Sequence, residues 1–366
     1  MKPALHTDPE AHRFGSSPPL SIGVEEELLL VDEELALTPG AEAVMSLIPE
    51  GAGDRVSTEI FSEQIEVKTG VCLGVEQALA ELREARGLVA STGYGLLGAG
   101  LHPTAEGRVR LVAKPRYDVV KEDLGEMILS TPPCGLHVHV GIPDPEAAVR
   151  IANSFRRYLP ALTALSANSP FHAGADSGHA SARTTVVRAY PRFQVPRAFR
   201  DYEDFCRVAD DLIVAAGVAD YTYIWWDVRP HPRLGTVEVR AVDVQSDAAT
   251  SVALAALIQA IAARELEHPS GEGHSREALE ESYFQAASHG LEARIVLDDD
   301  APGPAREVAR QMLEAARPYA RELGAEDALG EVERILREGN GADEQRRVGR
   351  ERGMPAVLSH LAARTR

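Results

Sequence analysis

The sequence predicts an α+β protein with a largely antiparallel sheet. Two observations support this fold class. Strand-like segments come early and in hairpin-like pairs, whereas the chain from Ala248 onward has the pattern of helices almost throughout. The proline-rich stretch from Pro230 to Gly235 separates two further strand-like segments, which is typical of a hairpin turn. A doubly wound parallel sheet would instead alternate strands and helices along the chain.

The individual elements follow from the spacing of apolar residues. Residues 75–90 place Leu79, Leu82 and Val89 on one side of a helix. The other predicted helices are residues 38–47, 145–167 and 199–216, and the predicted strands are residues 21–32, 94–101, 135–142, 224–229 and 236–243. We expect a flexible arm at residues 1–18 and a single domain at residues 19–366, with a helical tail at residues 305–366.

Composition excludes one class of partner. The 366 residues carry a net charge of -18 at pH 7, and 44% of them are hydrophobic, which is enough to build a sizeable core. Binding to nucleic acid would need a concentrated basic stripe to overcome this repulsion, and the sequence contains none. We therefore expect no nucleic-acid partner. A surplus of carboxylates is compatible with divalent cations that carry an anionic substrate.

Cysteine usage and hydropathy indicate the compartment. Cys72, Cys134 and Cys206 lie far apart and form no CxxC pair, so neither a disulfide framework nor a cysteine-rich zinc site is expected. The longest apolar stretch, residues 252–263, is too short to span a bilayer, and the first residues lack the apolar segment of a signal peptide. We expect a cytoplasmic protein with no membrane partner.

One glycine motif resembles a nucleotide site but is in the wrong context. Gly93, Gly95 and Gly98 match the letters of the dinucleotide fingerprint, which requires a strand before it and a helix after it. Here a helix precedes the glycines and a strand follows. We interpret them as a helix cap and as positions of close strand packing. The sequence has no phosphate-binding GxxxxGK[ST] loop, so bound ATP would need its phosphates held by other means.

Acidic residues stand in unexpected places. Glu25 and Glu27 lie in an apolar strand, where a period of two puts both on one face. They repel each other unless a cation lies between them, although a solvated sheet face is the alternative. Glu59, Glu63 and Glu66 follow. In an unbroken strand the first and last of these would face opposite sides, so either the segment is partly helical or a break re-aims one carboxylate.

Two later strands carry further polar side chains. His137 and His139 share one strand face, a spacing found both in metal sites and on solvated sheets. Thr236, Glu238 and Arg240 share a face of the last predicted strand. The glutamate and the arginine could form a structural ion pair, or they could hold a metal ion and a phosphate respectively.

These segments together predict a site rich in hard oxygen ligands. Five or more carboxylates with one or two imidazoles suit Mg²⁺ or Mn²⁺ better than structural zinc. ATP-driven chemistry requires divalent ions that bridge the β- and γ-phosphates. From the residues alone, a metal-dependent phosphoryl-transfer or ATP-driven ligase site therefore ranks first.

Five strings taken in order resemble a known family. They are SIGVEEELLLVD, STEIFSEQIEVKTGVC, GLHVHVGIPD, LSANSPFHAGADSGHASAR and WWDVRPHPRLGTVEVRAVD. They are similar to the successive motifs of the carboxylate-amine ligase family, the second type of glutamate-cysteine ligase. The similarity runs from about residue 20 to about residue 295. It implies the glutamine-synthetase-like fold, in which a curved, mainly antiparallel sheet forms a funnel with helices outside.

The resemblance also implies a reaction. ATP and Mg²⁺, with Mn²⁺ as an alternative, would be the cofactors. The γ-phosphoryl group of ATP would pass to the side-chain carboxylate of glutamate or a related acid, and an amine such as cysteine would then form the amide. We favour weak glutamate-cysteine ligase activity, with another amine acceptor as an open alternative.

Roles for single residues follow from the same resemblance. The metal ligands that it implies are Glu25, Glu27, Glu59, Glu66, His137 and Glu238. The implied catalytic residues are Arg240, Glu238 and His139. The implied nucleotide-binding residues are Arg240, Arg229 and Thr236, and the implied substrate-binding residues are Arg183, Thr69 and Glu63.

Some positions depart from the family pattern. His172 and His179 stand where an aromatic residue and a tyrosine are usual, and Ser282, Phe284 and Ser288 stand where Asn, Trp and Arg are usual. The metal and ATP motifs are intact. We interpret the departures as drift in the residues that surround the substrate.

Two other functions stay open at this stage. A metal-dependent hydrolase could use the His137/His139 pair, completed by His102, His172, His179 or His231, but it leaves the acidic motifs unexplained. A non-catalytic relative could bind ATP or an amino acid without turnover. The sequence leaves open whether the chain forms a homo-oligomer.

Overall fold

The computed structural model describes residues 12–271, 273–297 and 302–365. In this part of the chain seven strands form one sheet, in the order β2-β3-β1-β5-β9-β8, with β4 also paired to β1. Every pairing in the sheet is antiparallel. The strands are β1 (Ile22–Val31), β2 (Val56–Thr58), β3 (Gln64–Lys68), β4 (Gly95–Leu97), β5 (Gly135–Gly141), β8 (Val228–His231) and β9 (Thr236–Asp243). The predicted α+β class with a mainly antiparallel sheet is confirmed.

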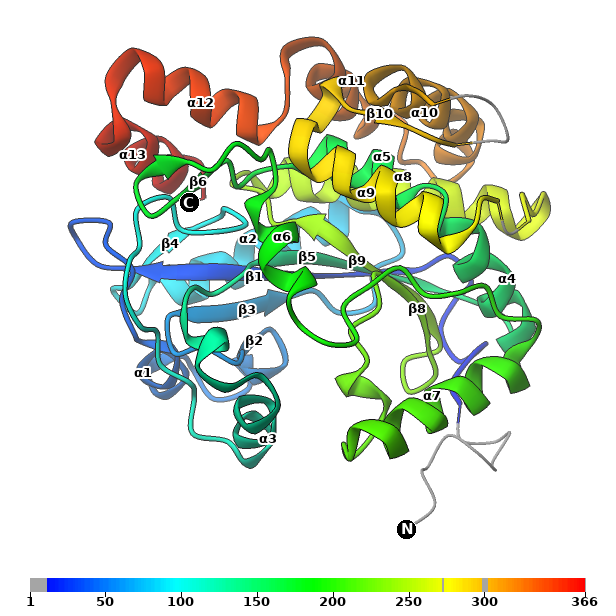
Figure 1. Cartoon of the computed structure of the whole chain (residues 1–366), viewed down its shortest axis with the longest axis horizontal. Helices are drawn as coiled ribbons and strands as arrows, with labels where there is room; N and C mark the ends of the chain where they lie inside the picture. Colours follow the sequence, from blue (N-terminus) through cyan, green and yellow to red (C-terminus); the bar gives the residue numbers. More distant parts are fainter. Residues whose placement is uncertain (1–11, 272, 298–301, 366) are drawn as a thin grey trace.

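Strand β1 shows why the two faces of the sheet differ. Val24, Glu26 and Leu28 are buried on one face, whereas Glu25 and Glu27 are partly exposed on the other, as the alternation of a strand requires. Helices α2 and α8 pack on β1, and α4 and α5 pack on β9. Figure 1 shows α8 to α11 on one side of the sheet and α3 and α7 on the other. Helices therefore cover the apolar face and leave the polar face to line a cavity.

The helices account for most of the remaining chain. The predicted helix at residues 75–90 is confirmed without any change in its bounds, as α2 (Val75–Ala90). The other helices are α1 (Ala41–Leu47), α3 (Pro115–Leu124), α4 (Pro145–Phe155), α5 (Leu159–Ser166), α6 (Ala182–Arg188), α7 (Tyr202–Ala216), α8 (Ala248–Glu267), α9 (Arg276–His289), α10 (Ala305–Glu322), α11 (Leu329–Glu338), α12 (Gly341–Arg352) and α13 (Met354–Thr365). Short elements are η2 (Ala52–Asp54), η3 (Gly125–Leu129), η4 (Tyr221–Tyr223), η5 (Gly290–Glu292), β6 (Phe171–His172), β7 (Ala175–Asp176), β10 (Arg294–Ile295) and β11 (Gly303–Pro304).

Helix α8 is apolar all round because it is buried. Among the described residues it is the helix long and apolar enough to cross a membrane, but most of it lies inside the protein. It packs against α2, α10 and α11 as well as the sheet. A helix that is hydrophobic on every side and surrounded by protein is a core helix.

The helix predicted at residues 145–167 is in fact two helices. α4 ends at Phe155 and α5 begins at Leu159. Pro160 is the reason: it has no N–H to bond to the carbonyl of Arg156, and its ring would clash with that carbonyl, but it is well accommodated in the first turn of a new helix.

The strand predicted at residues 224–229 begins later, at Val228. The residues before it form η4 and an irregular stretch, because Trp226 packs on Phe199 and Phe205 in a second, smaller core. The hairpin of β8 and β9 is confirmed. The strand predicted at residues 94–101 is likewise shorter, at Gly95–Leu97.

The glycines of the dinucleotide-like motif have packing roles. Gly93 follows α2 with a φ of 90°, a backbone conformation that favours glycine. A Cβ on Gly98 would lie 2.5 Å from the carbonyl oxygen of Gln245. Helix α2 precedes this segment and β4 follows it, as the sequence predicted.

The described part of the predicted N-terminal arm is held against the sheet. Residues 1–11 lie outside the described residues. The backbone N–H of Arg13 donates to the carbonyl of Pro232 at 2.8 Å, that of Gly15 donates to Ile142 at 2.9 Å, and Phe14 is buried.

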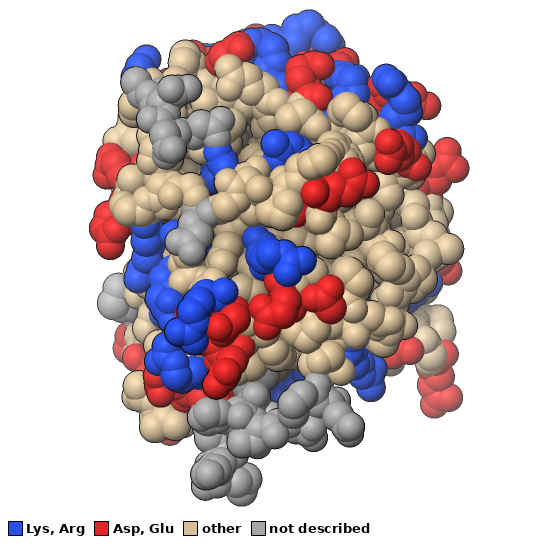
Figure 2. Space-filling view, turned by 90° about the vertical axis from the view of Figure 1, so that its right-hand side faces the viewer, with Lys and Arg blue, Asp and Glu red and all other residues tan. Residues whose placement is uncertain are grey.

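Charged side chains are interspersed on the face where α4 and α7 lie. Figure 2 shows acidic and basic groups side by side on this face. One pair on α7 is Asp204 with Arg207, and Arg197 contacts the same carboxylate at 2.8 Å. The negative net charge is therefore not concentrated on this face.

Candidate active site

A cavity on the polar face of the sheet collects most of the predicted site residues. Its empty volume is about 740 Å³, and we call it the central cavity. Strands β1, β3, β5, β8 and β9 supply one wall, and α3 and η4 contribute to the other. The predicted site residues that line it are Glu25, Glu27, Glu59, Glu66, His137, His139, Arg229, Glu238 and Arg240.

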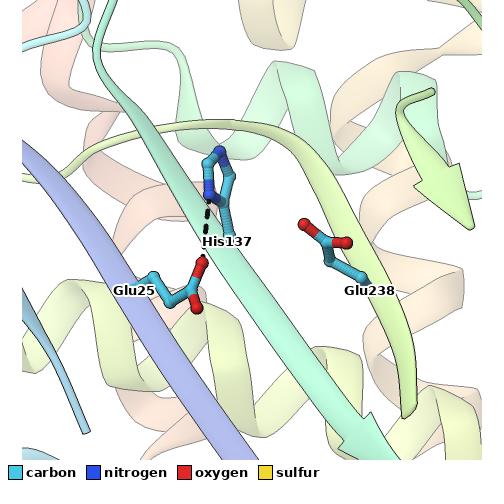
Figure 3. Close-up of side chains that lie close together, drawn as sticks. All are labelled: Glu25, His137 and Glu238. Atoms are coloured by element: carbon cyan, nitrogen blue, oxygen red, sulfur yellow. Dashed lines mark ion pairs between the residues drawn. The ribbon is translucent and has the colours of Figure 1, made fainter. Parts of the chain in front are cut away.

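Strand register brings three of these side chains together. Glu25 on β1 is paired in register with His137 on β5, and His139 on β5 is paired with Glu238 on β9. One ligand atom each of Glu25, His137 and Glu238 lies within 4.8 Å of the others. Figure 3 shows these three side chains, from three adjacent strands, on the same side of the sheet. The arrangement depends on the antiparallel pairing of β5 with β1 on one side and with β9 on the other.

His137 and its neighbour His139 each have a ring nitrogen without a hydrogen-bond partner. Nδ1 of His137 lies 3.5 Å from the Glu25 carboxylate, and Nε2 of His139 lies 3.6 Å from it. The Nε2 atoms of His137 and His139 are both buried and have no hydrogen-bond partner. Leaving a buried polar atom unpaired costs about 1 to 3 kcal/mol. Two such nitrogens beside carboxylates therefore fit a divalent cation.

A second acidic group lies next to the first. Burial raises the pKa of Glu59 well above its ordinary value, and the carboxylates of Glu66 and Glu27 raise it further. Burial, followed by the carboxylate of Glu25, also raises the pKa of Glu66. Two like charges 4 Å apart repel by about 4 kcal/mol at an effective dielectric constant near 20. Glu27, Glu59 and Glu66 thus form a group that a cation would stabilise.

The turn that separates strands β2 and β3 brings Glu59 to this group. β2 ends at Thr58 and β3 begins at Gln64, and a turn lies between them. Glu66 is paired in register with Glu27, and Ser57 donates to the Glu66 carboxylate at 2.7 Å. Of the two alternatives from the sequence, the break is confirmed and the helix is wrong.

Two arginines balance the charge of Glu238. Arg229 Nε donates to one carboxylate oxygen at 2.6 Å, and Arg240 Nη1 donates to the other. Burial favours the neutral carboxyl, but these two guanidinium groups hold its pKa well below the ordinary value. Both alternatives for this pair are compatible with the geometry, because Glu238 also belongs to the candidate cation group.

A β-bulge positions Arg240. Between the pairs Leu136–Val242 and Val138–Val239, strand β9 holds one residue more than β5. Arg240 lies in this extra stretch, and its N–H donates to the carbonyl of Asp227 at 2.7 Å. Bulges commonly re-aim side chains beside active sites.

His139 is oriented by a hydroxyl. Its Nδ1 lies 2.9 Å from Thr236 Oγ1. Burial lowers the pKa of His139, but Glu25 and Glu238 outweigh this and raise it overall. His231 packs edge-on against it, with ring centroids 5.5 Å apart. Burial lowers the pKa of His231 to about 3, so this ring is neutral at physiological pH.

Two further cavities adjoin the central one. The edge cavity, with an empty volume of about 1110 Å³, is lined among others by Arg13, Lys68, Thr69, Arg233 and Thr236, and it shares Glu25 and His139 with the central cavity. The apolar chamber, of about 550 Å³, is lined by several apolar side chains together with Arg183 and Tyr190. It shares Glu27, Glu59, His137 and Arg240 with the central cavity. The acidic groups therefore lie between the edge cavity and the apolar chamber.

The structure separates the predicted substrate-binding residues. Arg183 lines the apolar chamber and Thr69 lines the edge cavity, where its hydroxyl accepts the N–H of Val24 at 3.0 Å. Glu63 lines none of the three cavities. Its carboxylate accepts the backbone N–H of Arg110 at 3.1 Å.

Several lining residues were not predicted. Lys68 lies 3.2 Å from the Glu66 carboxylate, and the period of two from Glu66 is a signal that could have identified it. Arg116 and Tyr117 on α3 and Trp225 after η4 reach the central cavity from outside the sheet. No local sequence pattern indicates that those elements cover the site.

The positions that depart from the family pattern lie elsewhere. His179 Nδ1 is 3.1 Å from Ser288 Oγ, and the His179 and Phe284 rings pack at 6.2 Å. Ser282 accepts the N–H of Val296 at 3.2 Å. None of these residues lines one of the three cavities. His179, Ser288 and Phe284 contact one another. The interpretation that the departures surround the substrate stays a prediction.

The geometry gives little support to the alternative of a metal-dependent hydrolase with histidine ligands. Of the four histidines considered for completing the His137/His139 pair, His231 alone lines the central cavity. His102 bonds to the carbonyl of Leu35 at 3.0 Å, and His172 is exposed on β6.

Comparison with known proteins establishes the family. The model of glutamate-cysteine ligase family 2 matches residues 21–356. This chain belongs to that family. The family consists of ATP-dependent ligases, and the resemblance inferred from the five motifs is confirmed.

The sequence similarity extends over nearly the full length of individual relatives. A protein of Rubrobacter xylanophilus, provisionally named glutamate-cysteine ligase 2-3, is 40% identical over 365 residues, which covers 96% of this chain and 99% of the relative. A protein of Natronomonas pharaonis named glutamate-cysteine ligase is 34% identical, covering 93% of this chain and 95% of its own.

Solved structures show the same fold at low identity. Glutamate-cysteine ligase of Francisella tularensis, crystallised with AMP, superposes with a TM-score of 0.73 at 12% identity and covers 94% of this chain and 87% of its own. A bifunctional glutathione synthetase of Pasteurella multocida gives 0.67 at 14% identity, covering 94% of this chain and 52% of its own. The predicted ligase fold is thus confirmed.

Proposed function

We propose that this protein uses ATP and Mg²⁺ to join the side-chain carboxylate of glutamate, or of a related acid, to an amine. One observation carries the proposal: carboxylates and imidazoles from four parts of the sequence converge on one cavity between the edge cavity and the apolar chamber. Family membership supports the same reaction class.

The proposal places two cations in the central cavity. Glu25, His137 and Glu238 would hold one Mg²⁺, and Glu27, Glu59 and Glu66 would hold the other, with Mn²⁺ as a substitute. Oxygen-rich ligands with a single imidazole suit these ions. When bound, the cations neutralise the phosphates and allow a carboxylate to approach them.

Three residues would act on the transferred phosphoryl group. Arg240 is placed by the bulge at the junction of the central cavity and the apolar chamber, where its guanidinium would stabilise the charge that develops on that group. Its Nε is buried without a partner, so it has a free donor. Glu238 fixes this guanidinium, and His139 would donate from its Nε2 side to a phosphate oxygen.

The edge cavity suits the nucleotide. Lys68, Arg233 and Arg13 offer positive charge, and the hydroxyls of Thr69 and Thr236 offer hydrogen bonds to a ribose or phosphate. Arg229, from the adjoining wall, would complete the phosphate-binding side. In this assignment Thr69 contacts the nucleotide side rather than the amino acid.

Arg183 would bind the α-carboxylate of the amino-acid substrate. It is 2% exposed, and its Nε and Nη1 have no hydrogen-bond partner. Asp243 lies 3.7 Å away, but Ser169 and Ser181 already donate to the Asp243 carboxylate. A buried guanidinium with free donors is suited to a carboxylate.

Transfer of the γ-phosphoryl group to the side-chain carboxylate would release ADP and give an acyl phosphate. The amine would then attack the acyl carbon, and phosphate and a proton would leave. The acceptor in the family's usual reaction is cysteine, and we propose that this chain forms γ-glutamylcysteine weakly.

The whole described chain would work as one ligase domain in the cytoplasm. The buried apolar residues of α10 to α13 belong to the same core cluster as the sheet, so the helical tail would be part of that domain. Cys72, Cys134 and Cys206 are buried free thiols, which suits a reducing compartment.

ADP release in the presence of Mg²⁺ tests the proposal. We expect release to need both glutamate and an amine, with an amide product detected by mass spectrometry. Glu238→Gln should lower the rate at least about 100-fold, because it removes a cation ligand and frees Arg240. Ser288→Ala removes a buried hydroxyl that contacts His179 and lines none of the three cavities, and it should retain the rate.

ADP release that does not depend on an amino acid would contradict the proposal. Nucleotide binding without any ADP release would favour the non-catalytic relative, and zinc-dependent hydrolysis without ATP would favour the hydrolase.

A further inference from the structure

The apolar chamber is built differently from the other two cavities. Most of its wall is apolar and comes from the turn before β3, from α3 and η3, and from the loops that follow α6 and η4. The side chains that matter here are Ile60, Val120, Leu124, Ile128, Phe193 and Trp225. The polar groups are confined to the end shared with the acidic cluster and to Gln64, Arg183 and Tyr190, and the Gln64 amide already donates to the carbonyl of Pro133 at 3.0 Å.

The position of the chamber limits what can occupy it. Because it shares Glu27, Glu59 and Arg240 with the central cavity, a molecule in the chamber reaches the place where the phosphoryl group is transferred. The edge cavity lies on the other side of the acidic cluster and carries the lysine and arginine side chains that a triphosphate requires. The carboxylate donor and the amine acceptor therefore share the chamber.

A compact polar acceptor would leave most of the chamber wall without a contact. Burial of apolar surface is favourable, so a wall of leucine, isoleucine, valine and aromatic side chains selects an acceptor with a matching apolar body. Cysteine has a single methylene and a thiol. Among the described residues that line the chamber, His137, Arg183, Tyr190 and Arg240 have an unpaired polar atom. His137 and Arg240 lie at the end shared with the central cavity, so Tyr190 and Arg183 are the two away from that end.

Tyr190 is suited to bind a polar group on the acceptor. Its hydroxyl is buried and without a partner. Burial, and to a smaller extent Glu27, raises its pKa to about 12, so it stays a neutral donor at physiological pH. A single hydrogen bond beside an apolar wall fits the carboxylate or carbonyl of a hydrophobic amino acid.

Resting on the proposed function, we infer that the preferred amine acceptor is an amino acid with a large apolar side chain rather than cysteine. The acceptor's side chain lies against the wall formed by Val120, Leu124, Ile128 and Phe193. Its amine points to the acidic cluster, and Tyr190 donates to its carboxylate.

Competing acceptors test this inference directly. Purified protein with Mg²⁺, ATP and glutamate is assayed for ADP release with leucine, phenylalanine, alanine, serine or cysteine. We expect kcat/KM for leucine or phenylalanine to exceed that for cysteine by at least about tenfold. Alanine and serine control for the amino acid backbone without an apolar body.

Substitutions in the chamber, with one control outside it, test which residues select the acceptor. Phe193→Ala should lower kcat/KM for the apolar acceptors about tenfold and leave the KM for ATP unchanged. Phe284→Ala removes an exposed aromatic side chain that lines no cavity and should change neither. Tyr190→Phe should raise the KM of every amino-acid acceptor and leave the KM for ATP unchanged.

The outcomes separate the inference from the proposed function. If cysteine is the best acceptor, the inference is wrong and the ligase function stands. If Phe193→Ala raises the KM for ATP, the chamber holds the adenine base and the inference is also wrong. If no amino acid supports ADP release, the proposed function fails; calorimetric binding of phenylalanine against cysteine, in the presence of Mg²⁺ and a non-hydrolysable ATP analogue, then still tests which one the chamber prefers.

Discussion

The two faces of β1 treat their carboxylates in opposite ways. Glu26 faces the helices, is fully buried and forms two 2.8 Å hydrogen bonds to Arg86. Arg86 also donates to the carbonyls of Gln245 and Ser246. Glu25 and Glu27, its neighbours on either side, face the central cavity and lie near other carboxylates and imidazoles with unpaired nitrogens.

The contrast shows where the protein supplies its own counter-charge and where it leaves this to a ligand. On the helix face an arginine neutralises the carboxylate, and the pair joins β1, α2 and the segment after β9. On the cavity face burial and neighbouring carboxylates raise the pKa of Glu59 and of Glu66. Burial favours the neutral form of Glu25, but His139 and His137 hold its pKa well below the ordinary value. Three consecutive glutamates thus provide a matched set, because the same substitution can be made in both environments.

The largest difference is expected in turnover. Glu25→Gln and Glu27→Gln should each lower kcat about 1000-fold, equivalent to about 4 kcal/mol, because each removes a cation ligand without changing the shape of the side chain. Glu26→Gln should stay within about threefold of the unchanged protein at a temperature where it is folded. ADP release measures all three. Equal losses at the three positions would remove the distinction between the faces.

The next largest difference is expected in stability. Glu26→Gln leaves a buried, incompletely compensated Arg86 and should lower the free energy of unfolding by about 3 kcal/mol. Glu25→Gln should lower it by less, about 1 kcal/mol at most, since that carboxylate is partly exposed and lies beside two imidazoles rather than a guanidinium group. Denaturant unfolding in the absence of divalent ions compares them. An equal loss for Glu25→Gln would mean that the cavity face is structurally paired to the same extent.

Ligand linkage gives a smaller, more specific effect. Mg²⁺ with a non-hydrolysable ATP analogue at about 100 times its Kd should stabilise the unchanged protein by about 2.7 kcal/mol. The same ligands should stabilise Glu26→Gln equally and Glu25→Gln much less. Chelation of the metal should abolish the stabilisation. The unfolding temperature, measured with and without the chelator, gives the size of the stabilisation. Stabilisation that persists after chelation would contradict a role for cations.

The smallest effect concerns Asp204, a buried carboxylate whose arginine partners are largely exposed. Hydrogen bonds from Arg197, with the N–H of Arg200 and Arg207 adding to them, hold the pKa of Asp204 below its ordinary value of 3.8. Because the folded pKa is depressed, this stability is present above about pH 4 and is lost as the pH falls further. Asp204→Asn should cost about 1 kcal/mol at pH 7, as its arginine partners are largely exposed. The cost should shrink toward pH 3, and unfolding across this range would reveal a pH-independent difference if the account is wrong.

Local periodicity predicted the parts of the site that lie on regular strands. Alternation along β1 and β5 placed Glu25 with Glu27 and His137 with His139, and the structure brings all four to one cavity. It also left Glu26 on the opposite face, where the sequence gives no indication of its partner, because Arg86 lies 60 residues away on a helix.

Features that depend on irregular backbone were harder to predict. Glu59 reaches the cavity through the turn between β2 and β3, and Arg240 through a bulge that depends on the register with β5. Glu63 appeared equivalent to Glu59 in the sequence, yet it bonds to the backbone of Arg110. The break at Pro160 could have been predicted, since proline cannot continue the hydrogen-bond ladder of a helix.

The number of divalent cations bound in the presence of an ATP analogue tests the central claim most directly. Free Mn²⁺ can be counted by its electron paramagnetic resonance signal as each protein is titrated. We predict two bound Mn²⁺ for the unchanged protein and for Glu26→Gln, and one fewer for Glu25→Gln and for Glu27→Gln. Retention of both ions by the two cavity-face variants, or loss of an ion from Glu26→Gln, would contradict the account.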